Sequence, residues 1–487
     1  MKNRSKSAIV LGIFGVAMIS AFVTTHALNT TNRIRIVDPM IGCAQFCKPD
    51  ESFPITVEYS GIVAASSWKI AARSDDFSWS PAISLAITSV SGPMGGHYTL
   101  VASVPATALP GLYDLAVSCM AIGTNLTVVE PHVLSIYTSI TSLRVAHLTD
   151  PHLCYPDANA TLNLAPPSFP IIKGKRSIDN NFHDLLQQVS IVRPQFVLLT
   201  GDIATRGLEQ EFQEARQILA TASVPVLCAI GNHDHRSPPS YEYYLAPLYY
   251  SRSIGQWRVI ILDSGASEGN GLYGEQMRWL EQELEQANAS GQQSFIAMHI
   301  PSSTDAVGGN TIAGNAEFRA LCARYGVRCV LAGHHHFSDA YYANGTRVTR
   351  PDPFYPGTGP LYVKTGSTTL DYDNGYDQLG WRYIRSEANG SLSIGYDIEG
   401  NGTSNPLFGL PLNGLAREDG TLSITLRNYY RVNFTNITIP VIFSTNHQYI
   451  PSEGTMIAQE HGASNTGILL GVNLPATTNK TITFTEV

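Results

Sequence analysis

Three features are scarce in this sequence, and each absence excludes a class of protein. Lysine and arginine number 31 against 39 aspartates and glutamates, so the chain has a formal net charge of −8. A nucleic-acid-binding face needs an excess of basic residues, so such a partner is not expected. Seven cysteines in 487 residues are too few for a disulfide-rich scaffold. No apolar run beyond residue 23 is long enough to cross a bilayer.

Residues 1–27 have the parts of an export signal. Three basic residues precede an almost wholly apolar run at 8–23, and small residues end at Ala27, after which we place the cleavage site. An uncleaved N-terminal anchor is the alternative. Either way we expect an extracytoplasmic glycoprotein, secreted or at the cell surface. Its Asn-x-Ser/Thr sequons begin at Asn29, Asn125, Asn159, Asn288, Asn344, Asn389, Asn401, Asn433, Asn436 and Asn479.

Cysteine spacing leaves the pairing of the thiols open. In an oxidising compartment we expect a few disulfide bonds. Cys43 and Cys47 share the N-terminal region with Cys119, and Cys322 and Cys329 are close in sequence. The odd count leaves at least one cysteine unpaired within the chain.

Changes in sequence texture divide the rest of the chain into three regions. Residues 34–140 show short strand-like segments, punctuated by turns such as Gly92-Pro93, which predicts an immunoglobulin- or fibronectin-like β-sandwich. Residues 143–395 alternate apolar strands with helical patterns, as α/β layered domains do. Residues 400–487 return to a β pattern and predict a small β-rich domain, with an alternating strand over 420–426.

Six polar blocks occur in order through the central region, and each of them follows an apolar run. The runs, which we expect to be buried strands, cover 143–148, 196–200, 224–230, 257–262, 294–298 and 327–332. The blocks are Asp150-Pro151-His152, Gly201-Asp202, Gly231-Asn232-His233-Asp234, Asp263-Ser264, His299 and Gly333-His334-His335-His336. Ligands bind beyond the strand ends of α/β sheets, so these side chains are expected to converge in one crevice.

The converging side chains offer two carboxylates, one amide oxygen and four imidazoles, enough to hold two metal ions side by side. A carboxylate such as that of Asp202 can bridge two cations about 3.5–4 Å apart. Imidazole and carboxylate ligands together suit manganese, iron or zinc better than calcium or magnesium. We therefore expect two divalent or mixed-valence ions, of undecided identity, in a site of the kind that hydrolyses phosphate esters.

These blocks resemble the motifs of the calcineurin-like metallophosphoesterase superfamily over about 143–395. The resemblance implies a four-layer α/β core, in which two packed mixed β-sheets are flanked by helices and the metals lie at the strand ends. It implies a first metal held by Asp150, His152, Asp202 and His336. It implies a second metal held by Asp202, Asn232, His299 and His334.

The resemblance also implies a mechanism. A hydroxide that bridges the metals would attack phosphorus in line with the leaving oxygen. His233 would protonate that oxygen or stabilise the phosphoryl charge, and Asp234 would orient His233. His335 would point away from the metals. Asp263 is expected either to orient a neighbouring group or to cap its strand.

Two residues narrow the resemblance within the superfamily. The purple acid phosphatase branch has Gly in place of His152 and a Tyr shortly after the Gly-Asp pair, where this chain has Thr205. The chain resembles the cyclic-nucleotide phosphodiesterase-like branch more, and 271–280 fits the helix that follows Asp263-Ser264 in that branch. Other polar residues near the blocks are candidates for shaping the pocket, with an ordinary surface or packing role as the favoured alternative for each: Tyr155, Asp157, Arg206, His235, Tyr372 and Tyr376.

We therefore predict a secreted, dinuclear-metal phosphohydrolase. Its substrate would be a phosphate ester, either a small molecule or derived from a cell surface, with a diester slightly preferred. A phosphomonoesterase using the same site is one alternative. A non-catalytic cell-surface binding protein that keeps the domain as a scaffold is another. The sequence leaves open the leaving group, the role of the β-domains and the oligomeric state.

Overall fold

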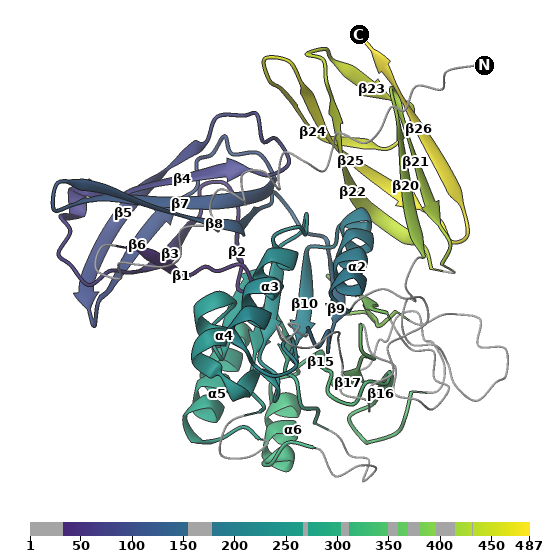
Figure 1. Ribbon diagram of the computed structural model, residues 1–487. Helices are drawn as coiled ribbons and strands as arrows, with labels where there is room; N and C mark the ends of the chain where they lie inside the picture. Colours follow the sequence, from purple (N-terminus) through teal and green to yellow (C-terminus); the bar gives the residue numbers. More distant parts are fainter. Residues whose placement is uncertain are drawn as a thin grey trace, which may run out of the picture.

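The computed structural model describes residues 33–153, 178–265, 271–302, 311–348, 359–368, 380–395, 414–430 and 432–487 (Figure 1). The predicted export signal lies outside these residues. So do Cys154, the sequons at Asn29, Asn159 and Asn401, and the pocket candidates Tyr155, Asp157, Tyr372 and Tyr376. Among the helices of the described ranges, none is both long and apolar enough for a membrane crossing.

The N-terminal part is an eight-stranded sheet that folds over its own core, in the order β1-β3-β6-β5-β4-β7-β8-β2. Side chains alternate between buried and exposed along strands such as β3, as expected for a sheet with one face in the core. Its strands are β1 Arg35–Asp38, β2 Gln45–Cys47, β3 Ser52–Glu58, β4 Lys69–Ser74, β5 Ile83–Met94, β6 His97–Ser103, β7 Gly111–Ala121 and β8 Thr124–Ile136. A short 3-10 helix, η1, covers Ala65–Ser67.

The turn predicted at Gly92-Pro93 is wrong, because β5 continues through these residues to Met94. The pairing of β5 with β6 shifts register between Ser91 and Met94. Proline lacks the N–H that a regular ladder needs, and an irregularity of this kind accommodates it within a strand.

Two sheets stack in the central part of the chain. The first has the order β11-β10-β9-β18-β19 and the second the order β12-β13-β14-β15-β17-β16. Strands β9 to β11 are parallel, as are β13, β14, β15 and β17. The strands are β9 Ser142–Leu148, β10 Phe196–Thr200, β11 Val226–Ala229, β12 Tyr250–Ile254, β13 Trp257–Ile261, β14 Gln293–Ala297, β15 Cys329–Ala332, β16 Asp339–Tyr341, β17 Leu361–Lys364, β18 Arg382–Glu387 and β19 Leu392–Ser393.

Helices cover the outer faces of both sheets (Figure 1). The two faces of β14 belong to different cores. Phe295 and Ala297 join the core shared with the first sheet, whereas Ile296, and Met298 just after the strand, pack among apolar residues of α5 and α6. Helices α2 and α3 contribute to the shared core from the other side. The helices are α2 Ile178–Val192, α3 Glu209–Leu219, α4 Pro238–Tyr244, α5 Gly274–Ala289, α6 Asn315–Arg324 and the 3-10 helix η2 Asp234–Arg236. The predicted four-layer α/β core is confirmed.

The C-terminal part consists of two antiparallel sheets, β20-β21-β26-β23 and β22-β25-β24. The strands are β20 Leu415–Gly420, β21 Ser423–Asn428, β22 Phe434–Phe443, β23 Tyr449–Pro451, β24 Thr455–His461, β25 Thr466–Leu474 and β26 Asn479–Glu486. The unbroken strand predicted over 420–426 is wrong. Gly420 pairs with Ser423, so a two-residue hairpin turn interrupts the alternating pattern.

The N-terminal part contacts both other parts. The two Nη atoms of Arg216, on α3, donate hydrogen bonds to the Glu130 carboxylate of β8 at 2.6 and 2.7 Å. Trp79 packs so closely on the C-terminal part that a Cβ on Gly462 or Gly467 would collide with its ring. These contacts link the N-terminal domain to both other parts of the chain.

The disulfide bonds expected from the sequence are absent among the described cysteines. All six are free and buried: Cys43, Cys47, Cys119, Cys228, Cys322 and Cys329. Each thiol packs in a core as a small apolar side chain. Burial raises the pKa of Cys47 and of Cys329 to about 12, so the thiol form prevails.

Candidate functional site

The predicted ligands lie where parallel strands of both sheets end. Asp150, Asp202 and Asn232 follow β9, β10 and β11 of the first sheet, and His299 and His334 follow β14 and β15 of the second. Parallel strands end at one edge of a sheet, and these two sheets stack, so their polar ends meet. Each block therefore follows a strand, as predicted.

Three glycines allow the blocks to approach one another. A Cβ on Gly231 would collide with the backbone nitrogen and carboxylate of Asp202. A Cβ on Gly333 would collide with the Thr149 hydroxyl and the Asp150 carboxylate, and one on Gly201 would lie 2.7 Å from His299 Nδ1. The absence of a side chain at these positions is thus what brings ligands from different strands together.

Five of the predicted metal ligands have a left-handed backbone, which is uncommon outside glycine. Residues held in this region cost about 1–3 kcal/mol each and gather at functional sites. The surrounding buried strands hold this backbone in place. The φ angles are 53° at Asp150, 49° at His152, 49° at Asp202, 72° at His334 and 56° at His336.

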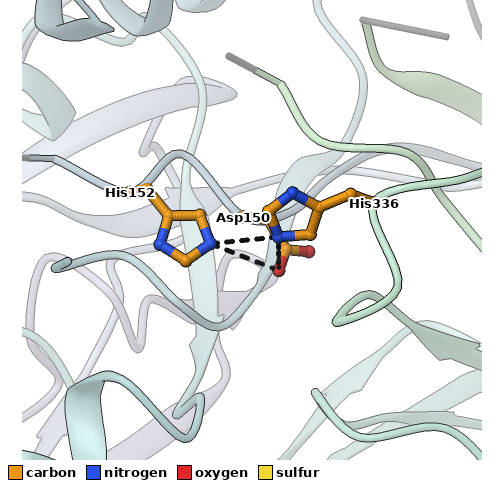
Figure 2. Close-up of side chains that lie close together, drawn as sticks. All are labelled: Asp150, His152 and His336. Atoms are coloured by element: carbon orange, nitrogen blue, oxygen red, sulfur yellow. Dashed lines mark hydrogen bonds and ion pairs between the residues drawn. The ribbon is translucent and has the colours of Figure 1, made fainter. Parts of the chain in front are cut away.

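A first group of donor atoms is formed by Asp150, His152 and His336 (Figure 2). The two Nε2 atoms lie 3.1 Å apart, and Asp150 Oδ1 lies 3.1 Å from His336 Nε2 and 3.8 Å from His152 Nε2. At most one proton can lie between two imidazole nitrogens, and buried Asp150 Oδ1 accepts no hydrogen bond among the described residues. Lone pairs that face one another in this way fit a cation.

A second group is formed by Asp202, His299 and His334, whose donor atoms all lie within 4.8 Å of one another. His299 Nε2 lies 3.2 Å from Asp202 Oδ2 and 3.0 Å from Asn232 Oδ1. Asp202 Oδ2 is also 3.7 Å from His152 Nε2 of the first group. The Asp202 carboxylate therefore lies between the two groups, where a bridging ligand is needed.

Hydrogen bonds behind the site fix the orientation of its ligands. His299 Nδ1 donates to the Thr200 carbonyl at 2.7 Å, which leaves the Nε2 lone pair for a metal. The Thr149 hydroxyl lies 2.5 Å from Asp150 Oδ2 and 3.0 Å from the same Thr200 carbonyl. One backbone oxygen thus orients one ligand of each group.

The charge of the site favours a cation. Burial opposes ionisation of Asp150 and Asp202, but neighbouring imidazoles hold the pKa of both carboxyls well below the usual range, His336 first for Asp150 and His299 first for Asp202. Burial also opposes charge on His299, yet these two carboxylates raise its pKa to about 10. Burial lowers the pKa of His152 to about 3, so this imidazole is neutral, as a ligand must be.

The loop with His233 lies beside the donor groups. Its backbone N–H donates to Asp202 Oδ1 at 2.8 Å, and its ring stands edge-on to His152, with centroids 4.8 Å apart. His233 Nδ1 donates to the Thr205 carbonyl at 2.6 Å. Nε2 is therefore the ring nitrogen on the side of the donor groups, 3.9 Å from Asp202 Oδ2.

The prediction that Asp234 orients the His233 ring is not met, because the Thr205 carbonyl has that role. The Asp234 carboxylate is buried and accepts three backbone N–H groups instead, from Gly231 at 2.9 Å, Ile203 at 3.2 Å and Ala204 at 2.8 Å. Burial and the nearby Asp202 charge raise the pKa of Asp234 to about 7. Asp234 thus holds the loops after β10 and β11 against each other.

Residues 143–338 match the family model for calcineurin-like phosphoesterases. This part of the chain is a calcineurin-like phosphoesterase domain. The cAMP/cGMP dual specificity phosphodiesterase of Mycobacterium tuberculosis is 27% identical over 213 residues, which cover 39% of this chain and 61% of that protein.

A second relative of the phosphoesterase domain is the 3′,5′-cyclic adenosine monophosphate phosphodiesterase of Pseudomonas aeruginosa. It is 24% identical over 272 residues, or 52% of this chain and 89% of the relative. The predicted likeness to cyclic-nucleotide phosphodiesterases is thereby confirmed. Among solved structures, the yellow lupin purple acid phosphatase PPD1 aligns with a TM-score of 0.45 at 14% identity, covering 79% of this chain and 70% of that one.

Other predicted residues of the phosphoesterase domain lie beside the donor groups without joining them. His335 stacks on Phe337, with centroids 5.5 Å apart, so it points away as predicted. Asp263 Oδ1 accepts two hydrogen bonds, one from His235 Nε2 at 2.6 Å and one from the Gly265 N–H at 3.1 Å. Asp263 therefore both orients the His235 ring and caps its strand end. Arg206 Nε binds the Glu211 carboxylate of α3 at 3.1 Å.

Sequence reasoning missed the buried polar residues behind the ligands. His147 Nε2 lies 2.8 Å from the Thr200 hydroxyl, and His147 Nδ1 lies 2.7 Å from the Thr365 hydroxyl. This chain of contacts links the two sheets of the phosphoesterase domain. A histidine inside an apolar strand was the available signal, but Thr365 lies 218 residues from His147.

Proposed function

We propose that the phosphoesterase domain holds two metal ions and hydrolyses phosphate esters, with diesters preferred over monoesters. The observation that carries the proposal is the pair of buried donor groups with Asp202 between them. The aligned region spans only about three fifths of the mycobacterial relative. The activity of the whole chain therefore rests on the site itself.

The donor set fits two metals. Asp150, His152 and His336 would hold the first, with Asp202 shared. Asn232, His299 and His334 would complete the second set. When bound there, two metal ions would polarise the phosphoryl oxygens and lower the pKa of water. Manganese, iron and zinc all suit this mixture of imidazole and carboxylate ligands.

His233 supplies the proton transfer in this proposal. Because Nδ1 donates to the Thr205 carbonyl, a second proton can reside only on Nε2, on the side of the donor groups. The imidazolium can then donate that proton to the leaving oxygen. The Asp202 carboxylate lies 3.9 Å from Nε2. Removing such an acid typically costs a factor of about 10² to 10⁴ in rate.

The preference for diesters rests on the relatives. The two described above are cyclic-nucleotide phosphodiesterases, and a 27% identical protein of Enterobacter lignolyticus is a glycerophosphodiester phosphodiesterase. The metal site would serve a monoester equally well. The ratio of the hydrolysis rates of a diester and a monoester therefore decides between the two substrate classes.

The test compares bis-p-nitrophenyl phosphate with p-nitrophenyl phosphate, with Mn²⁺ present, after dialysis against chelator. The diester should be the faster substrate, and Asp202→Ala and His299→Ala should be nearly inactive. Asp419→Ala, on the exposed part of β20, is the matched carboxylate control and should behave as wild type. Full activity in both site variants would refute the proposal. Less than one metal per chain, with no rescue by Mn²⁺, would favour a non-catalytic scaffold.

We further propose that the protein works outside the cytoplasm. The export signal at 1–27 and the sequons support this location. Mass spectrometry of the natively produced protein should find an N-terminal peptide that begins at Leu28. A first peptide that starts at the initiator methionine, in protein recovered from the cytoplasm, would refute it.

A further inference from the structure

Three turns of the N-terminal domain carry the most exposed large apolar side chains of the described residues. Ile62, Ile122 and Met94 are 87%, 85% and 83% exposed, and Met120 beside them is 52% exposed. A single exposed apolar residue needs no explanation, but a group of them marks an interaction site.

The three turns lie at the same end of the domain. Strand β3 ends where β6 begins, with Glu58 paired to His97, and β5 ends beside them. Because β4 runs antiparallel to β7, with Lys69 paired to Ser118, the residues before β4 lie near the turn that follows β7. The Ser67 hydroxyl also lies 3.5 Å from the Met120 carbonyl, which joins the first turn to the third. The apolar side chains therefore project from one end of the strands.

Two contacts of the domain with the rest of the chain lie at its opposite end. Asp76, after β4, pairs with Arg193 of the phosphoesterase domain. Trp79 packs on the C-terminal part. Figure 1 shows the N-terminal domain extending to one side of the molecule, away from the C-terminal sheets. At the end with the turns, Arg35 contacts Tyr243 of α4. The side chains of Ile62, Met94 and Ile122 nevertheless remain exposed there, so these tips can meet a large surface.

The composition of the turns indicates which surface this is. Neither a charged nor an aromatic residue occurs in the three turns and the strand ends next to them, which cover 60–67, 92–96 and 120–124, although the chain has a net charge of −8. Protein interfaces rely on Trp, Tyr and Arg for most of their energy, and the turns have none of these. Glu58, next to the first turn, is paired with Arg35 at 2.8 Å, while Lys69 and His97 flank the turns. Uncharged aliphatic tips with basic flanks fit the surface of a lipid bilayer.

We propose that this end of the N-terminal domain docks on a lipid bilayer, with Ile62, Met94 and Ile122 entering its apolar layer. The fold would then hold the phosphoesterase domain at the membrane surface without a spanning segment. The inference goes beyond the proposed hydrolysis and does not depend on it, because the turns are far in sequence from every metal ligand.

The experiment is sedimentation with vesicles of phosphatidylcholine, with and without phosphatidylglycerol. The chain is produced from Leu28 onward, because the apolar segment at 8–23 would bind lipid by itself. A bacterial host without N-glycosylation keeps Asn125, on the third turn, unmodified. Wild type should bind, and the double variant Met94→Asp/Ile122→Asp should need about tenfold more lipid or worse.

A matched control separates insertion from a general effect of added charge. Ile450→Asp places the same substitution at a 54% exposed position of β23 and should bind as wild type. Circular dichroism melting should be alike in all three proteins. Wild type that stays in solution with both vesicles would overturn the proposal, and so would a turn variant that binds equally well. A wild-type dimer in light scattering that the turn variant dissociates would instead assign the turns to a contact between copies.

Discussion

Replacing Gly333 with alanine should damage the metal site through one methyl group. The added Cβ would collide with the Thr149 hydroxyl and with Asp150 Oδ2, both of which are buried. Asp150 would have to move, and its contacts with the Thr149 hydroxyl and the His334 N–H, at 2.5 and 3.0 Å, would weaken. Gly333 does not have a left-handed backbone, so the effect is steric rather than conformational.

The size of the Gly333→Ala effect follows from these contacts. Overpacking a filled site costs about 1–3 kcal/mol, and two weakened hydrogen bonds cost about 1 kcal/mol each. Alanine also lowers the conformational entropy of the unfolded chain, which offsets about 0.4–1 kcal/mol of this loss of stability. We expect the metal-free protein to lose about 2–4 kcal/mol of unfolding free energy. Displacing a ligand in this way should also weaken Mn²⁺ binding by at least about 10–100-fold.

Denaturant unfolding and calorimetric titration with Mn²⁺ would measure the two effects separately. Gly471→Ala is the matched control, because a Cβ there meets its first neighbour, Ile457 Cδ1, at an ordinary 3.4 Å and its backbone is likewise not left-handed. The reasoning is refuted if Gly333→Ala unfolds like Gly471→Ala and titrates Mn²⁺ like wild type.

Three further changes test the contacts around the site and between the domains. Thr149→Val removes the hydroxyl beside Asp150 and should weaken Mn²⁺ binding about 10–100-fold by calorimetry, whereas Thr149→Ser should not. Burial opposes charge on His132, but the hydrogen bond and charge of Asp75 raise its pKa above the ordinary 6.5. The stabilisation lost in His132→Gln should therefore be full at about pH 6 and vanish as pH rises through the folded pKa, by denaturant unfolding; a constant difference would contradict this. Arg216→Ala leaves buried Glu130 without its ion pair and should cost about 3–5 kcal/mol, of which Glu130→Gln in the same chain should restore a part.

The convergence of the candidate metal ligands could be predicted from the sequence because each lies in a local pattern. A buried parallel strand appears as an apolar run, and the first polar residues after it must lie at the sheet edge. Asp202 after β10 and His299 after β14 follow this rule without any knowledge of tertiary contacts. Stacking of two such sheets then leaves one place where the ends can meet.

Other features depend on contacts that no local pattern records. Asp234 follows His233 directly, yet its carboxylate accepts hydrogen bonds from three backbone amides. The His233 ring instead donates to the Thr205 carbonyl. The six described cysteines are free and buried, although Cys47 and Cys119 share one core, and sequence spacing does not reveal this. His147 and Thr365 come together only because one sheet packs on the other.

The strained backbone of the ligands explains why the site needs the whole fold. Five predicted ligands sit in left-handed conformations, and Gly201, Gly231 and Gly333 allow contacts that any Cβ would prevent. Neither feature stabilises the chain by itself, so the buried strands on either side must impose both. The donor atoms therefore face one another before an ion arrives, and metal binding needs little backbone rearrangement. A variant that loosens the strand ends should lose metal affinity even when every ligand is kept, as Gly333→Ala is designed to show.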